Sequence, residues 1–337
     1  MRVGVVGCGQ IGRRRAQVVQ ASPNDQLRSV ADLNLERARS MGSAFGCSTA
    51  TEWRALTSDP EIDAVVIATT HDALAEIGID AAANGKHVLV EKPMAWNADE
   101  AAALLAAVGS GLVLKVGYNH RHHPALVRAH SLVKEGEIGQ LLFIRCRYGH
   151  GGRPGYEREW RADRRRSGGG ELLDQGIHGI DLGRWFLGDF AQAVGMVETY
   201  AWESEGADTV EDNAFALLRT GTGQTMSLHA SWTQWKNLFS FEVFGDRGFL
   251  LVEGLGGSYG TERLTFGCRN TTGGPPVEWV ESFDEPDRSW EAEWSEFAGA
   301  IETGRQPPAN GEDGLAALKA VEAVYQSSVS GSVTAIE

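Results

Sequence analysis

The chain opens with Val3-Gly4-Val5-Val6-Gly7-Cys8-Gly9-Gln10-Ile11-Gly12, a short apolar run that leads into a Gly-x-Gly-x-x-Gly motif. The apolar run predicts a buried strand, and residues 11–20 predict a helix that begins inside the motif. A second strand-like run, residues 27–31, ends at Asp32, about 20 residues beyond the motif, where a dinucleotide-binding fingerprint places an acidic residue. Together these features predict a βαβ unit that binds a dinucleotide.

Each glycine of the motif has its own predicted role. Gly7 allows the tight turn, Gly9 lets the backbone approach a pyrophosphate, and Gly12 permits close packing of helix on strand. The helix N-terminus at Gln10 and Ile11 presents backbone N–H groups to the phosphates. We therefore expect all five residues to bind the cofactor.

Asp32 favours NAD over NADP. Its carboxylate accepts hydrogen bonds from the ribose hydroxyls, and its charge repels a 2′-phosphate. NADP stays open as an alternative, because Arg13, Arg14 and Arg37 lie close in sequence and a guanidinium accommodates the additional phosphate.

The length, net charge and cysteine spacing of the chain limit the classes of protein to which it can belong. The 337 residues favour two domains, and the net charge of -14 argues against a nucleic-acid partner. No apolar run is long enough to span a bilayer, and the N-terminal residues do not resemble a secretory leader. The four cysteines, Cys8, Cys47, Cys146 and Cys268, are too widely spaced to predict a zinc site or a disulfide framework. We expect a reduced, cytoplasmic setting without membrane contact.

The first third of the chain alternates strand-like and helix-like segments. Continuous β-branched runs such as residues 64–68 predict parallel strands buried on both faces. Predicted strands are residues 3–6, 27–31, 64–68, 87–90 and 112–116, and predicted helices are residues 11–20, 35–45, 73–83 and 98–108. This alternation predicts a dinucleotide-binding domain, a parallel sheet with helices on both faces, over residues 1–119.

Residues 120–337 follow another pattern. The predicted helices are residues 124–135, 171–186, 290–302 and 314–327, and the predicted strands are residues 141–148, 193–201, 213–219, 225–232, 239–244 and 249–252. Strands in succession without intervening helices predict a large, open, mostly antiparallel sheet in an α/β domain. Such a sheet leaves one face for another subunit, and we expect a homodimer or homotetramer.

Four segments together resemble the Gfo/Idh/MocA family of oxidoreductases. They are the glycine motif, Glu91-Lys92-Pro93 after residues 85–90, Gly117-Tyr118-Asn119-His120-Arg121, and the segment Gly168-Gly169-Gly170-Glu171-Leu172-Leu173-Asp174-Gln175-Gly176-Ile177-His178. The resemblance covers nearly the whole chain. It implies an N-terminal Rossmann domain and a C-terminal α/β domain with an open antiparallel sheet that binds substrate and forms oligomers.

The resemblance implies three catalytic residues, Lys92, Asp174 and His178. Lys92 follows a predicted parallel strand, and ligands of such folds bind at the carboxyl ends of the strands. Asp174 and His178 stand four residues apart on one helix face, so the aspartate can fix the tautomer of the imidazole. The three glycines before them indicate a close approach of the backbone to a ligand. From position alone, Lys92 could instead be a surface lysine, and Asp174 and His178 could be a pair that only stabilises the helix.

Other positions are expected around the cofactor and substrate because of the resemblance. The cofactor set includes Thr69, Thr70, His71, Glu91, Lys92, Asn119, Arg121, Trp160 and Arg161. The substrate set comprises Lys92, Arg121, Tyr156, Asp174 and His178. For His71 a solvated loop position remains an equal alternative. The Gly/Arg-rich residues 149–166 suit a lid over a polyol, or else a plain interdomain loop.

No metal site is expected. His120, His122 and His123 form a cluster of imidazoles, but no carboxylate or cysteine stands near them at metal-ligand spacing.

The expected activity is hydride transfer between a nicotinamide and a secondary alcohol or ketone of a sugar, a nucleotide sugar or a cyclitol. His178 acts as the general base, the Lys92 ammonium stabilises the alkoxide, and Asp174 supports the imidazolium. Two alternatives share the resemblance: an NAD-dependent glycosidase that oxidises its substrate transiently, and a non-catalytic NAD-sensing regulator. The presence of all three catalytic candidates counts against the regulator.

Overall fold

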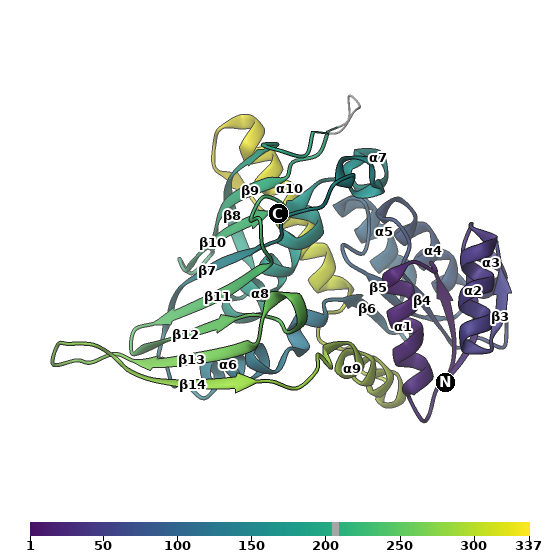
Figure 1. The fold of residues 1–337 in the computed structure, drawn as a ribbon, viewed down its shortest axis with the longest axis horizontal. Coiled ribbons are helices and arrows are strands. Elements are labelled where there is room, and N and C mark those ends of the chain that lie inside the picture. The colour runs from purple at the N-terminus through teal and green to yellow at the C-terminus, as the bar shows by residue number, and fades with distance from the viewer. Residues whose placement is uncertain (204–208) are drawn as a thin grey trace. The chain divides into compact units, whose positions relative to one another are not determined.

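The computed structural model describes residues 1–203 and 209–337. These residues form two compact units. The first unit contains Met1–Tyr118 and Trp290–Leu315, and the second contains Asn119–Ser289 and Ala316–Glu337. Each unit is built on its own sheet (Figure 1).

The first unit contains a parallel sheet of six strands in the order β3-β2-β1-β4-β5-β6, which confirms the predicted Rossmann architecture. The strands are β1 Arg2–Val6, β2 Gln26–Ala31, β3 Ser48–Ala50, β4 Ala64–Ile67, β5 His87–Glu91 and β6 Leu114–Gly117. The strand order reverses between β1 and β4, and ligands of such sheets bind at this switch point, outside the carboxyl ends of the strands.

Helices cover both faces of this sheet. They are α1 Gln10–Ala21, α2 Leu35–Phe45, α3 Arg54–Thr57, α4 His71–Ala83, α5 Ala98–Val108 and α9 Ser289–Thr303. On one face, apolar side chains of α1, α2 and α9 join those of β1, β2 and β4 in a single core. On the other face, Gly4 of β1 faces Leu56 of α3, and Gly78 of α4 faces Ile67 of β4.

Helix α9 lies in the first unit, although the predicted boundary assigned every residue after 119 to the second domain. Trp294 and Phe297 of α9 are buried in the core beneath the parallel sheet. The indole Nε1 of Trp294 also donates a hydrogen bond to Asp25 Oδ2, at 2.8 Å. The structure therefore corrects the predicted extent of the first domain, because this helix buries its apolar face there.

The second unit contains a sheet of nine strands in the order β14-β13-β12-β11-β7-β10-β9-β8-β15. The strands are β7 Leu141–Gly149, β8 Phe190–Glu198, β9 Asn213–Thr220, β10 Thr225–Ser231, β11 Leu238–Gly245, β12 Gly248–Glu253, β13 Glu262–Cys268, β14 Val277–Phe283 and β15 Thr334–Ala335. Strands β7 and β10 pair in parallel, and the other neighbouring pairs are antiparallel. The mostly antiparallel sheet is confirmed.

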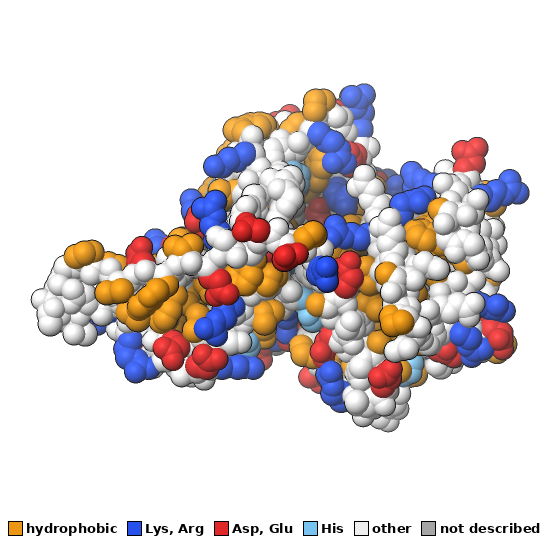
Figure 2. All heavy atoms as spheres, turned by 60° about the horizontal axis from the view of Figure 1, so that its bottom comes forward, with side chains coloured by type: hydrophobic (Ala, Val, Ile, Leu, Met, Phe, Trp, Pro, Cys, Tyr) orange, Lys and Arg blue, Asp and Glu red, His pale blue; other side chains and the backbone are white. Residues whose placement is uncertain are grey.

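Helices pack on one face of this sheet. They are α6 Pro124–Lys134, α8 Ile177–Leu187 and α10 Gly311–Ser330, whereas the short helix α7 Arg164–Ser167 packs against the 3₁₀ turn Trp160–Ala162. Gly179 and Gly183 let α8 approach Leu228 and Met226 of β10, and Gly195 of β8 similarly accommodates Val324 of α10. The other face is open and carries exposed apolar side chains. Figure 2 shows hydrophobic side chains gathered on the part of this sheet that ends in β13 and β14.

Across residues 1–203 and 209–337, the structure holds no helix of the length and apolar character that a membrane crossing requires.

Candidate active site

The glycine loop joins β1 to α1 with the geometry that its motif predicts. Gly7 has a φ of +96°, and a Cβ there would lie 2.3 Å from the carbonyl oxygen of Ala68. A Cβ on Gly12 would lie 1.7 Å from the carbonyl oxygen of Gly7. A Cβ on Gly9, by contrast, would meet no described atom within 4 Å. Gly7 and Gly12 thus serve the turn and the packing, whereas Gly9 leaves space over the N-terminus of α1.

Asp32 follows β2 and closes the other side of this loop. Its Oδ2 accepts a hydrogen bond from the backbone N–H of Cys8, and its Oδ1 accepts one from that of Asn34, both at 2.8 Å. A carboxylate oxygen offers more than one lone pair, so Asp32 can accept further donors such as ribose hydroxyls. The free space at Gly9, the helix N-terminus and this carboxylate fit the phosphates and ribose of a dinucleotide.

These contacts predict that Gly9→Ala and Gly12→Ala behave differently. Gly9→Ala is expected to leave the thermal unfolding temperature nearly unchanged but to weaken NADH binding about tenfold, because its methyl group occupies the pyrophosphate position. Gly12→Ala is expected to lower both the unfolding temperature and the affinity for NADH, because its Cβ would collide with the carbonyl oxygen of Gly7. NADH fluorescence titration and a thermal melt of each variant measure the two effects. Equal losses of stability in both variants would contradict this assignment.

Thr69, Thr70 and His71 follow β4, at the edge of the sheet where the glycine loop lies. Thr70 Oγ1 donates to Asp72 Oδ1 at 2.5 Å, and His71 begins α4 and is buried. Burial removes the alternative of a fully solvated loop residue for His71. Contact of these three residues with a cofactor stays a prediction.

Glu91, at the end of β5, belongs to a buried charge cluster. Arg15 of α1 donates from Nε to Glu91 Oε1 at 2.7 Å and from Nη1 to Glu293 Oε2 of α9 at 2.6 Å. The ring of Trp290 lies 4.4 Å from the Arg15 guanidinium carbon. Burial raises the pKa of the Glu91 carboxyl, and the nearby charge of Arg15 opposes that rise. The structure therefore gives Glu91 a structural ion pair, and its predicted cofactor contact gains no support.

Lys92 lies directly after this cluster, at the carboxyl end of β5. The peptide bond from Lys92 to Pro93 is cis, and Met94 N–H donates to the Glu91 carbonyl oxygen at 3.0 Å to close the turn. Lys92 thus stands at the edge of the sheet where ligands of Rossmann folds bind. Glu91, the residue that precedes Lys92, is anchored by its ion pair with Arg15.

Asp174 lies in a π-helical turn, Leu172–Gly176, that leads directly into α8. The sequence predicts an ordinary α-helix over residues 171–186, whereas the structure forms a π-helical turn at its beginning. Arg161 donates from Nε to Asp174 Oδ2 at 3.0 Å. Isolated π-turns are rare and are frequently found at functional sites. Arg161, predicted as a cofactor contact, is seen in the second unit as the partner of the Asp174 carboxylate.

The three glycines before this turn serve packing, and the predicted approach to a ligand is wrong for two of them. A Cβ on Gly169 would lie 2.3 Å from the Tyr325 hydroxyl, and one on Gly170 would lie 1.9 Å from the carbonyl oxygen of Glu211. Gly168 has a φ of +80° and ends the short helix α7. The close approach is to the protein's own backbone and side chains.

Glu211 holds the start of this segment. Its buried carboxylate accepts hydrogen bonds from the N–H groups of Gly170 and Leu172 at 3.0 and 3.1 Å, and from the Tyr325 hydroxyl at 2.7 Å. Burial raises the pKa of the Glu211 carboxyl, and the hydrogen bonds from Tyr325 and the backbone limit that rise. The turn that carries Asp174 is thereby fixed at its beginning.

His178, in the first turn of α8, stacks on His120 of the 3₁₀ turn Asn119–His122. Their ring centroids are 3.9 Å apart and their planes meet at 25°. His120 also contacts the Tyr148 hydroxyl of β7, with 3.0 Å between Nε2 and the oxygen. Sequence reasoning assigned His120 no role beyond excluding a metal site. The Nδ1 atom of the nearby His123 lies 3.0 Å from Glu262 Oε2, within hydrogen-bonding distance. Within the described residues no group of three potential metal-ligating side chains occurs.

Arg121 and Asn119 bind other parts of the second unit. Arg121 makes a bidentate ion pair with Asp181 of α8, with Nε–Oδ2 at 2.8 Å and Nη2–Oδ1 at 2.6 Å. Asp181 is 0% exposed, so this pair lies in the interior. Asn119 Nδ2 donates to the Ser289 hydroxyl at 2.9 Å. The ion pair favours a structural role for Arg121 over its predicted contact with cofactor or substrate.

Tyr156, predicted to bind substrate, is packed in an aromatic cluster. It is 2% exposed and lies edge-on to Trp232 with 4.8 Å between centroids. Trp202 and His150 complete the cluster around it. This burial favours packing over substrate contact. Trp160, predicted beside the cofactor, stacks under the guanidinium of Arg161 at 4.5 Å.

Several residues that shape these sites could not be found from the sequence. Glu293, Asp181, Glu211 and Tyr325 are each separated from their partners by between 39 and 278 positions. No local motif marks them, because each acts through a long-range ion pair or hydrogen bond.

A Rossmann unit with a dinucleotide-fitting loop, joined to an open-sheet unit, defines a nicotinamide-dependent oxidoreductase of two domains. The chain belongs to the Gfo/Idh/MocA family. Residues 1–118 match the family model described as an oxidoreductase family, NAD-binding Rossmann fold, and residues 126–251 match that of the GFO/IDH/MocA C-terminal domain. The resemblance stated from the sequence motifs is confirmed.

Characterised proteins are similar to this chain over much of its length. A levoglucosan dehydrogenase of Pseudarthrobacter phenanthrenivorans is 30% identical over 284 residues, 74% of this chain and 73% of that protein. A 1,5-anhydro-D-fructose reductase of Ensifer adhaerens is 30% identical over 341 residues, 100% of this chain and 98% of that protein. A solved structure of levoglucosan dehydrogenase in complex with NADH has a TM-score of 0.91 at 25% identity, covering 100% of this chain and 99% of that one.

Proposed function

We propose that the protein is an NAD-dependent dehydrogenase or reductase that acts on a secondary hydroxyl or keto group of a cyclic sugar, a nucleotide sugar or a cyclitol. The observation that carries the proposal is the glycine loop with Asp32, in a chain whose similar proteins act on sugars. The named activities of these relatives, a sugar dehydrogenase and a sugar reductase, support the reaction class.

The first unit supplies the cofactor site. Gly9 and the N-terminus of α1 receive the pyrophosphate, and Asp32 receives the adenosine ribose, which favours NAD. When bound, NAD supplies a nicotinamide that accepts the hydride of the substrate carbon. Arg13 and Arg14 are engaged elsewhere, near the rings of Phe45 and Trp290, respectively. These contacts reduce the support for NADP.

We assign the proton chemistry to Lys92, Asp174 and His178. In the oxidative direction His178 takes the hydroxyl proton, and the ammonium of Lys92 stabilises the negative charge that develops on the substrate oxygen. Asp174, held by Arg161, supports the imidazolium that forms. In the reductive direction His178 returns the proton.

A substrate panel tests the proposal. Levoglucosan, 1,5-anhydro sugars, inositols, aldoses and nucleotide sugars are each incubated with NAD or NADP, and the absorbance of the reduced cofactor is followed. We expect NADH formation with at least one cyclic polyol and weaker activity with NADP. Glycoside cleavage without net NADH would establish the glycosidase instead. Tight NADH binding without turnover of any substrate would favour a sensing regulator.

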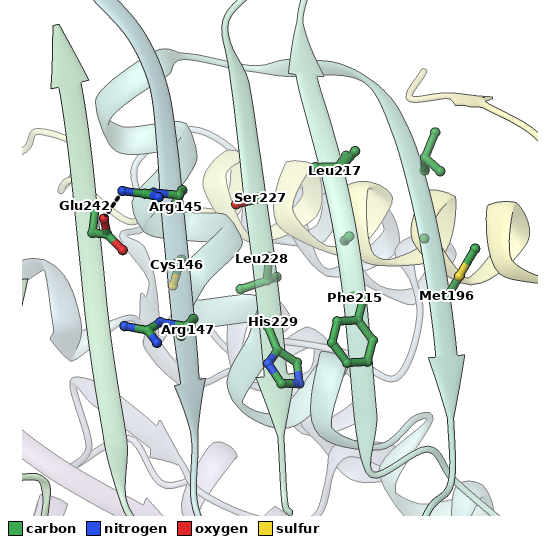
Figure 3. Close-up of a pocket in the computed structure, with 13 residues that line it drawn as sticks. Arg145, Cys146, Arg147, Met196, Phe215, Leu217, Ser227, Leu228, His229 and Glu242 are labelled. Carbon is green, nitrogen blue, oxygen red and sulfur yellow. Dashed lines mark hydrogen bonds and ion pairs between the residues drawn. The ribbon is translucent and has the colours of Figure 1, made fainter. Parts of the chain in front are cut away.

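We further propose that two copies of the chain associate through the open face of the second sheet. This face carries the exposed side chains of Met196 on β8 and of Phe215 and Leu217 on β9, and the Arg145–Glu242 ion pair between β7 and β11. They line a shallow pocket of about 660 Å³ (Figure 3). A face with both apolar side chains and opposite charges is suited to pair with a second copy of itself, as a two-fold interface requires.

The substitution Leu217→Arg is expected to break this association. Leu217 is 52% exposed in the single chain, so the arginine does not disturb the fold but places an unpaired charge in the interface. Light scattering after size-exclusion chromatography should show a multiple of 36.4 kDa for the natural chain and 36.4 kDa for the variant. Val329→Arg, at a position 91% exposed on α10, serves as the control. A natural chain that elutes as a monomer would overturn the prediction.

A reduced, cytoplasmic location remains part of the proposal. Its support is that all four cysteines are free.

A further inference from the structure

We propose that His120 is a positioning residue for His178: its neutral ring stacks on the His178 imidazole and stabilises the imidazolium that arises during proton transfer. The inference rests on the proposed role of His178 as the base. It starts from the stack itself, in which 3.9 Å separates two ring centroids at an interplanar angle of 25°.

The hydrogen bonds around His120 fix which of its nitrogens carries the proton. The Asn119 amide donates from Nδ2 to the Ser289 hydroxyl, so its Oδ1 is the atom that faces His120. This oxygen lies 3.2 Å from His120 Nδ1, and because an amide oxygen only accepts, Nδ1 carries the hydrogen. The amide and the imidazole thus form a defined donor–acceptor chain.

The second nitrogen of His120 is then an acceptor. It lies 3.0 Å from the hydroxyl of Tyr148, which burial keeps protonated by raising its pKa well above the usual value. A protonated phenol can donate to Nε2, and a His120 ring that accepts this hydrogen bond is neutral. A cationic His120 would place a second positive charge on the face of an imidazole that must itself accept a proton, which is unfavourable at this separation.

A neutral ring held in this way offers its electron-rich face to His178. A cation over an aromatic face is stabilised by the ring quadrupole, and more strongly where water is excluded. Other ionisable groups also surround this pair. The negative charges of Glu171 and Asp174 help to raise the pKa of the Tyr148 hydroxyl. The ring of Tyr259 packs against that of Tyr148, and Arg161 forms an ion pair with Asp174.

His123 lies edge-on to His120, with 5.5 Å between their ring centroids. Its Nδ1 lies 3.0 Å from Glu262 Oε2, so that imidazole has a carboxylate partner of its own.

Nuclear magnetic resonance of histidine ring signals tests the inference without any substrate. The chain has nine histidines, and the His178 signal is identified by its loss in His178→Gln. The measured pKa of His178 is compared in the natural chain, His120→Leu and His120→Phe. We expect His120→Leu to lower it by about one, and His120→Phe, which retains an aromatic face, to keep it close to the natural value.

His130→Leu is the matched control. His130 stacks on Trp185 of the same helix α8 with 3.9 Å between centroids and 19° between planes, so its removal produces a similar loss of packing. We expect the pKa of His178 to stay unchanged in this variant. An unchanged or raised pKa in His120→Leu, or an equal fall in His130→Leu, would overturn the inference.

The outcome is separable from that of the substrate panel. If the pKa of His178 falls in His120→Leu and no polyol yields NADH, the stacked pair stands and the dehydrogenase proposal fails. If NADH forms but the pKa does not change, the positioning role alone fails.

Discussion

Lys92→Ala is expected to lower kcat about 10²- to 10³-fold on the substrate found by the panel, because the variant lacks the cation that stabilises the developing alkoxide. Lys92 directly follows β5 at the ligand-binding edge of the parallel sheet, next to the anchored Glu91. Binding of NADH should change little, since the phosphates and ribose are held by the glycine loop and Asp32. Steady-state kinetics and NADH fluorescence titration measure the two quantities.

Two further variants make this result interpretable. Lys92→Arg keeps the positive charge in a different geometry and should recover part of the lost rate. Lys134→Ala removes an exposed lysine at the end of α6 and should retain full activity. Full turnover by Lys92→Ala with normal kinetics would show that the alkoxide is stabilised by another group.

Arg121→Ala is expected to destabilise the second unit by about 3–5 kcal/mol, since it leaves the buried carboxylate of Asp181 without its partner. The ion pair joins the 3₁₀ turn Asn119–His122 to α8, which carries His178. Urea unfolding followed by circular dichroism measures the loss. If Arg121 binds substrate instead, the variant should show a raised KM at nearly unchanged stability.

The control for this prediction breaks an exposed ion pair. Arg54 and Glu76 lie 2.8 Å apart, but their side chains are 60% and 62% exposed. Arg54→Ala should therefore change stability by less than about 1 kcal/mol. The double variant Arg121→Met/Asp181→Leu should recover most of the lost stability, because it removes the buried charge together with its partner.

Elements with strong local signals could be predicted from the sequence. Helices α2 and α5 have the predicted bounds, because Asn34 and Asn97 cap their first turns through side-chain oxygens. Strands β13 and β14 were missed. Residues 277–282 of β14 are all exposed, so the strand lacks the alternation of buried and exposed positions that marks a half-buried strand.

The candidate site was predicted in part. The glycine loop and Asp32 have the geometry that the motif implies, because a strand–turn–helix of this kind is determined locally. The roles of Arg121, Glu91 and Tyr156 depend on side chains distant in sequence, and the structure places them in ion pairs or aromatic packing. The stack of His120 on His178 joins residues 58 positions apart and had no local signal.

The position of α9 affects how the chain folds during synthesis. Residues 1–118 emerge first, yet the core beneath their sheet includes Trp294 and Phe297. At about 5–20 residues per second, the ribosome needs roughly ten to thirty seconds to add the residues between 118 and 290. During that time the nascent Rossmann sheet exposes the apolar surface that α9 later covers. We expect this interval to be the period in which the chain most depends on chaperones.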